Sequence, residues 1–157
     1  MTLKKLKLIN IAVIFLLSFL AHNLYEWVPN TFTSIFFPVN ESIFEHMKII
    51  ATCFLFYGFF EFFLLQFLHI SFSNYLFSLI VCMISGILFY LLLFLPIYFF
   101  ISRSMIITIG LLFITYIFMN IVSYFILSFQ PIVHVEKASI VLIIALYTFF
   151  GYLTYCP

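Results

Sequence analysis

Residues 74–95 read NYLFSLIVCMISGILFYLLLFL and contain no charged side chain. A helix needs about 20 consecutive apolar residues to cross the hydrocarbon core of a bilayer, and this stretch meets that requirement. Comparable runs lie at about residues 8–28, 42–68, 104–128 and 138–155. The runs are continuous rather than alternating, which argues against a transmembrane β-barrel. The sequence therefore predicts an all-α integral membrane helix bundle of about five transmembrane helices, with residues 1–157 forming a single polytopic domain.

The composition also places the chain in a lipid bilayer. Hydrophobic residues make up 67% of it and charged residues only 7%, whereas an ordinary soluble domain is about half apolar and about a quarter charged. These values exclude a freely soluble globule, a disordered chain and a secreted disulfide scaffold. The net charge of +1 offers no basic face for nucleic acid. We therefore expect the bilayer to be the main partner, and the sequence leaves open a homo-oligomer or a membrane partner protein.

The N-terminal run is interpreted as a first membrane span rather than as a cleaved signal peptide. A cleavage site after Ala21 would need a small residue where Phe19 stands. Lysines precede this run, and the basic flanks of membrane spans stay in the cytoplasm. With five spans, the basic residues of the cytoplasmic side are Lys4, Lys5, Lys7 and Lys137, and those of the outer side are Lys48 and Arg103. The sequence thus predicts a multi-pass protein of the cell membrane with a cytoplasmic N-terminus.

Polar side chains concentrate where the first two spans are predicted to meet. Ser18, His22 and Glu26 are spaced four residues apart, so they share one face of the first span near its outer end. Residues 38–48, which open the second span, read PVNESIFEHMK. A short connection makes the two helices antiparallel neighbours and brings these segments to the same depth. We therefore expect one cluster of side chains there, composed of His22, Glu26, Glu41, Glu45, His46 and Lys48.

Such a cluster can do chemistry in two ways. Imidazole and carboxylate groups together suit a divalent metal such as zinc, iron or manganese, with one position open for water. The predicted metal ligands are His22, Glu41, Glu45 and His46. In the alternative without a metal, Glu45, His46 and His22 act as catalytic acid and base groups. The Glu45-His46 pair does not match the His-Glu-x-x-His zinc motif, so the spacing does not choose between them.

The same residues also have structural interpretations. Ser42 and Glu45 match the capping box Ser-x-x-Glu. Glu45 and Lys48 are spaced for an ion pair, and Lys48 could extend to the lipid headgroups. Caps and ion pairs do not explain why His22 lies inside an apolar run and faces these glutamates.

Glu61 lies deep in the second run, between phenylalanines. A charged residue at the bilayer centre is costly. We expect Glu61 to be protonated, to pair with a polar group such as Asn120 or Ser85, or to lie nearer the cytoplasmic interface; a proton relay is a further alternative. Polar stripes that are expected to face the bundle are Asn74, Ser78, Cys82 and Ser85 in the third run, and Tyr116, Asn120 and Ser123 in the fourth.

Two segments, Ala21-His22 through Glu26 and residues 38–48, carry a resemblance. The chain resembles a family of small uncharacterised multipass membrane proteins of Gram-positive bacteria. In that family a Pro-Val-Asn-Glu-Ser-x-x-Glu-His-x-Lys segment follows a first span that contains a histidine. The resemblance implies a polytopic bacterial membrane protein with a short polar tail after residues 154–157, and it implies no particular activity.

Two functions follow from these observations. The first is a membrane-embedded hydrolase, metal-dependent or acid/base, that acts on a lipid-type substrate at the outer leaflet. The second is a non-enzymatic membrane component (a partner subunit, an immunity-type factor or a small transporter) in which residues 38–48 form a helix-capping staple. The distance from the His22 ring to Glu45 and His46 tests the first, because groups more than about 10 Å apart cannot share a metal or pass a proton through one water.

Overall fold

The computed structural model describes residues 1–100 and 104–156. Over these residues the chain folds into six α-helices and no strand. The helices are α1 (Leu3–Trp27), α2 (Thr31–Phe36), α3 (Ile43–Phe67), α4 (Tyr75–Phe100), α5 (Met105–Ser128) and α6 (Val135–Tyr155). All except α2 are long and apolar enough to cross a membrane. The prediction of an all-α bundle with five helices able to span a membrane is confirmed, and α2 is a short helix that hydropathy did not predict.

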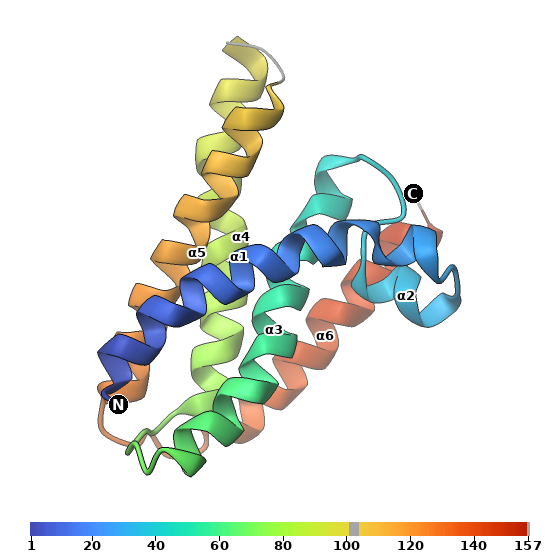
Figure 1. Ribbon diagram of the computed structural model, residues 1–157. Helices are drawn as coiled ribbons and strands as arrows, with labels where there is room; N and C mark the ends of the chain where they lie inside the picture. Colours follow the sequence, from blue (N-terminus) through green and yellow to red (C-terminus); the bar gives the residue numbers. More distant parts are fainter. Residues whose placement is uncertain (101–103, 157) are drawn as a thin grey trace.

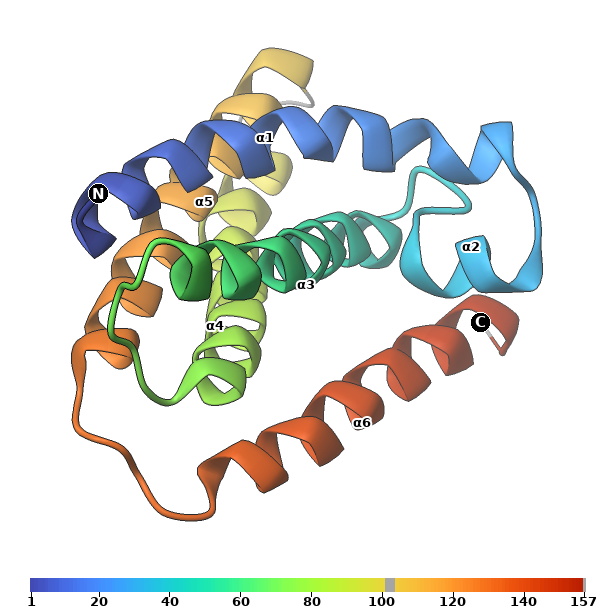
Figure 2. The ribbon, with the colours of Figure 1, turned by 60° about the horizontal axis from the view of Figure 1, so that its bottom comes forward.

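α3 packs against α1 and α4, and α4 packs in addition against α5 and α6. α1 and α6 lie on opposite sides of α3 (Figure 2). α4 and α5 form an antiparallel pair whose ends project beyond the rest of the bundle (Figure 1). The N-terminus lies beside the end of α5 and the loop between α3 and α4. We call this end of the bundle the near end, and the opposite end, where α1 finishes and α3 starts, the far end.

The loops at the near end are tied together by side chains that satisfy backbone groups, which is a requirement in hydrocarbon. The first turn of α4 is capped from α6, because the Glu136 carboxylate accepts a hydrogen bond from the Leu76 backbone N–H at 2.8 Å. The Asn74 side chain accepts from the Ile132 N–H at 2.8 Å and donates to the Gln130 carbonyl at 3.0 Å. These bonds fix the start of α4 against the chain that enters α6.

A buried ion pair lies inside the bundle, towards the near end. The Lys7 ammonium is 2.6 Å from Glu61 Oε1 and donates a hydrogen bond to the Ser123 hydroxyl, also at 2.6 Å. The Asn10 amide donates to Glu61 Oε1 at 2.5 Å, and the Tyr75 hydroxyl donates to Oε2 at 3.3 Å. The Lys7 and Glu61 side chains are only 5% and 3% exposed. The pair therefore links α1 and α3 directly and reaches α4 and α5 through two hydroxyl groups.

This pair corrects two expectations. The polar partner of Glu61 is Lys7, not Asn120 or Ser85. Lys7 can take this place because α1 begins at Leu3, so that Lys7 lies on the buried face of the helix rather than in a flank. Lys4 and Lys5 remain exposed. Arg103 and Pro157, which also entered the predictions, lie outside the described residues.

The polar stripes of α4 and α5 face the bundle as predicted. The buried members are Asn74, Ser78, Cys82, Tyr116, Asn120 and Ser123, and Ser85 is half-buried. Two of their contacts join helices: the Ser78 and Ser123 hydroxyls are 2.8 Å apart, and the Cys82 thiol lies 3.2 Å from the Met119 carbonyl oxygen. Small and polar side chains therefore line the α4–α5 contact, which is the usual pattern between membrane helices.

The Lys7–Glu61 pair gives a prediction about stability. Removing one partner of a buried ion pair leaves an unpaired charge and destabilises by about 3–5 kcal/mol. We expect Lys7→Met and Glu61→Met each to lower the free energy of unfolding by that amount, and the double variant to recover part of the loss. Equilibrium unfolding in mixed micelles measures all three. Losses that simply add in the double variant would show that the two side chains are not coupled.

Candidate metal centre

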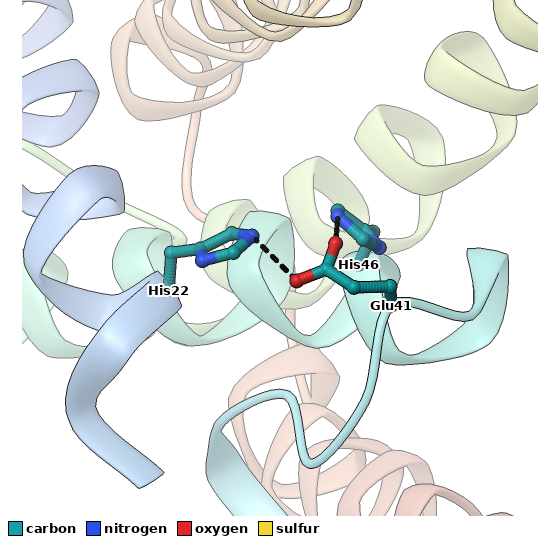
Figure 3. Close-up of side chains that lie close together, drawn as sticks. All are labelled: His22, Glu41 and His46. Carbon is teal, nitrogen blue, oxygen red and sulfur yellow. Dashed lines mark ion pairs between the residues drawn. The ribbon is translucent and has the colours of Figure 1, made fainter. Parts of the chain in front are cut away.

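Three side chains from two helices and a loop meet at the far end of the bundle (Figure 3). His22 lies in the last two turns of α1, Glu41 lies in the loop after α2, and His46 lies in the first turn of α3. The chain leaves α1, turns through α2 and returns towards α1 before α3 begins (Figure 1). This return brings Glu41 between the two histidines.

The distances are those of groups that can share one ion. His22 Nε2 lies 3.6 Å from Glu41 Oε1, and His46 Nε2 lies 3.3 Å from Glu41 Oε2. The two imidazole rings are 5.5 Å apart between centroids. One ligand atom from each of the three residues lies within 4.8 Å of the others. A tetrahedral metal with bonds of about 2.0–2.2 Å separates its ligand atoms by about 3.3–3.6 Å, so small shifts would close this set around an ion.

A hydrogen bond determines which nitrogen of His46 faces Glu41. His46 Nδ1 lies 2.8 Å from the Ser42 carbonyl oxygen. A carbonyl can only accept, so Nδ1 carries the hydrogen, and in the neutral ring Nε2 presents its lone pair to the carboxylate. Two acceptors at 3.3 Å need positive charge between them, supplied by a proton or by a metal ion. Metal-binding histidines are commonly oriented by this kind of Nδ1 bond to a carbonyl.

The cluster is open on one side. The Glu41 side chain is 78% exposed, His22 is 38% exposed and His46 is 23% exposed. An ion held by these three residues would keep a position for water or substrate, as catalytic zinc sites do. The exposed aromatic residue Trp27 at the end of α1 is typical of the membrane–water interface, so the cluster lies near that depth.

Glu45 lies in a different set of contacts, which the first turn of α3 makes with α2, α6 and the loop after α2. Its Oε2 accepts from the Lys48 ammonium at 2.7 Å and from the Val39 N–H at 2.9 Å. Lys48 also donates to the Ser34 carbonyl at 2.8 Å and to the Thr154 hydroxyl at 2.5 Å. This buried network, which we call the staple, joins α3 to α2 and α6. It uses the carboxylate oxygens of Glu45 away from the two histidines.

The structure thus divides the predicted cluster in two. It brings together His22, Glu41 and His46 on one side, and Glu45 and Lys48 on the other, while Glu26 is exposed. The Ser42 hydroxyl accepts from the Glu45 N–H at 3.3 Å as the capping box predicts. The Glu45 side chain, however, bonds to Val39, and Lys48 is 1% exposed rather than extended to the headgroups.

Sequence reasoning missed the residues that complete the staple. Ser34 and Thr154 are hydroxyl residues in apolar surroundings, and their contact partners lie far away in the chain. A signal for α2 was present, because Asn30 and Thr33 form a capping box around its first turn. That signal predicts the helix, and it does not predict which helix α2 packs against.

Comparison with known proteins gives a family and no activity. The chain matches over its whole length, residues 1–157, a family described as "Family of unknown function (DUF6512)". This agrees with the resemblance to an uncharacterised family. No curated protein and no solved structure matches. With five helices able to span a membrane, the chain is a multipass membrane protein that belongs to the DUF6512 family.

Proposed function

We propose that this protein is a membrane-embedded hydrolase that uses a divalent metal held by His22, Glu41 and His46. The observation that carries the proposal is the His46 Nδ1 bond to the Ser42 carbonyl, which aims Nε2 at Glu41 beside His22. Two imidazoles and one carboxylate are the ligand set of many catalytic zinc sites, and they also suit iron and manganese. Glu45 is assigned to the staple and not to the metal.

The position of the cluster favours a lipid-type substrate. The three residues lie where the apolar helices end, so a bond at the depth of a lipid's headgroup or ester linkages would lie beside them. A metal held there supplies Lewis-acid chemistry for hydrolysis of such a bond. Exposed Lys4 and Lys5 at the near end, together with Lys137 at the start of α6, support a cytoplasmic near end, which puts the cluster at the outer leaflet of the cell membrane.

The second candidate is a non-enzymatic membrane component. The staple favours it, because Glu45 and Lys48 fill their hydrogen bonds with groups of α2 and α6. This function accounts for Ser42, Glu45 and Lys48. It leaves the two histidines and the exposed Glu41 without a role, and for that reason we favour the hydrolase.

Metal content separates the two candidates. We expect about one zinc, iron or manganese ion per chain in protein purified in detergent, by mass spectrometry of the elements. His46→Ala and Glu41→Ala should lose the ion because each removes a ligand, whereas His69→Ala, an exposed histidine of the near end, should retain it. Glu45→Gln should also retain it. Wild-type protein that stays free of metal after dialysis against each ion would refute the metal site.

Hydrolysis is the second readout. Metal-loaded protein is expected to cleave fluorogenic acyl-ester or phosphoester lipids in mixed micelles, and a chelator should stop the reaction. Changing even an outer partner of a metal ligand lowers activity about 10–100-fold, so His46→Ala should lose more than about 100-fold. His69→Ala is again the control. If metal-loaded protein cleaves neither lipid class, the result contradicts the hydrolase and favours the non-enzymatic membrane component.

We expect a substitution in the staple to lower stability and leave the metal content unchanged, and a substitution in the metal cluster to remove the metal with little loss of stability. Lys48→Met leaves Glu45 buried without a counter-charge and should destabilise by about 3–5 kcal/mol, with the metal content of the folded fraction unchanged. His46→Ala should remove the metal and change stability by about 1 kcal/mol. Unfolding curves recorded beside metal analysis measure both. Equal destabilisation by the two variants would mean that the cluster is also part of the staple.

A further inference from the structure

The Lys7–Glu61 pair is one part of a longer set of buried polar groups. From Glu61, the hydrogen bonds continue to the Asn10 side-chain amide, and the Tyr57 hydroxyl donates to the side-chain oxygen Oδ1 of Asn10. From Lys7 they continue to the Ser123 hydroxyl, which is 2.8 Å from that of Ser78 on α4. The interior between α1, α3, α4 and α5 is therefore polar over about one turn of each helix at this level.

Two polar atoms in this interior make no close, well-aligned hydrogen bond to any described residue. They are the Tyr116 hydroxyl oxygen and the Asn120 side-chain oxygen. Tyr116 is 0% exposed and Asn120 is 2% exposed. An unsatisfied polar group inside a membrane costs several kcal/mol, and buried water normally satisfies such groups. Their position therefore points to ordered water between the helices.

The register of α1 against α5 shows where these two atoms lie between the near end and the far end of the bundle. Lys7 contacts Ser123, and the Phe15 and Phe113 rings are 5.0 Å apart, so the two helices run antiparallel. Asn120 and Tyr116 lie on α5 between Ser123 and Phe113. The two atoms thus come next after the ion pair on the way to the far end.

The polar set approaches both ends of the bundle to within about one helical turn. Towards the far end, the Tyr116 hydroxyl lies near the side chains of Ser18 and Cys53, and Ser18 is one turn before His22. At the near end, a groove is lined by residues that include Leu3 and Leu127, each one helical turn from Lys7 or Ser123. We call this set, from Lys7 and Glu61 through Asn120 and Tyr116 to Ser18, the polar column.

We propose that the polar column conducts protons between the two ends of the bundle. Carboxylate, hydroxyl and water groups both accept and release protons, and ionisable residues within membrane spans commonly form such relays. In each step a proton moves along one hydrogen bond to a hydroxyl, carboxylate or water, which releases another proton on its far side, so only O–H bonds change. The Asn120 side-chain oxygen only accepts, so it orients water and does not carry the proton. Buried Ile14 and Met119 are apolar neighbours on the same helices, which favours a proton over a hydrated ion. The proposal does not depend on the metal site.

Tyr116→Phe is the sharpest test, because it removes only a buried hydroxyl group, whose neighbours are the side chains of Ser18 and Cys53. The variant should fold as the wild type does. In liposomes loaded with a pH-sensitive dye, a potassium gradient and valinomycin should drive proton entry through wild-type protein above the rate of protein-free liposomes. Tyr116→Phe should reduce that flux about tenfold, which corresponds to the loss of one hydrogen bond from the path. Asn120→Leu should have a similar effect.

The control is Tyr152→Phe, since Tyr152 is an exposed tyrosine of α6 outside the column. It should conduct as the wild type does. Unfolding curves of all variants identify any change that comes from misfolding. Wild-type flux equal to that of protein-free liposomes, or equal flux in Tyr116→Phe and wild type, would overturn the proposal.

Discussion

The packing of the bundle depends on the Lys7–Glu61 ion pair. Lipid tails are as apolar as leucine, so the hydrophobic effect does not hold membrane helices together, and close packing and polar contacts have to do so. One ion pair with Asn10, Ser123 and Tyr75 around it makes such contacts to four helices at once. Because a buried charge without its partner is strongly unfavourable, this interaction allows only one rotation of α1 about its axis. The same rotation turns Ser18 into the bundle and His22 towards Glu41 and His46.

At the far end the staple has the corresponding role. Glu45 and Lys48 tie α3 to α2 and α6, and thereby fix the loop that carries Glu41. Neighbouring residues of a helix point about 100° apart, so once Glu45 faces α2 and α6, His46 is directed elsewhere. It faces Glu41 and His22. The contacts of the staple and the approach of His46 to Glu41 and His22 therefore belong to the same turn of α3, and the first directs the second. A metal ion in the second stays a proposal.

Much of this could be predicted from the sequence, because hydropathy and short-range spacing are local properties. The five long helices follow from run length, and the approach of His22 to His46 follows from a short connection between antiparallel helices. The partners of Glu61 and Lys48 could not be predicted in the same way, since each depends on which face of another helix is nearby. Hydropathy predicts Lys7 to be a flanking charge, because hydropathy does not define where a helix starts. The side chain of Thr2, which accepts from the Lys5 N–H, marks that start.

The remaining polar groups can be sorted by whether packing requires them. The ion pair and the staple are satisfied by protein partners, and stability explains their presence. The Tyr116 hydroxyl is different: a phenylalanine there would fill the same space without an unsatisfied oxygen, which in hydrocarbon is unfavourable. Glu41 is different for the opposite reason, because its exposed carboxylate bridges two histidines where solvent alone would suffice. Neither group is needed to hold the helices together. The metal ion and the proton transfer that we propose would each give one of these groups a reason to be there.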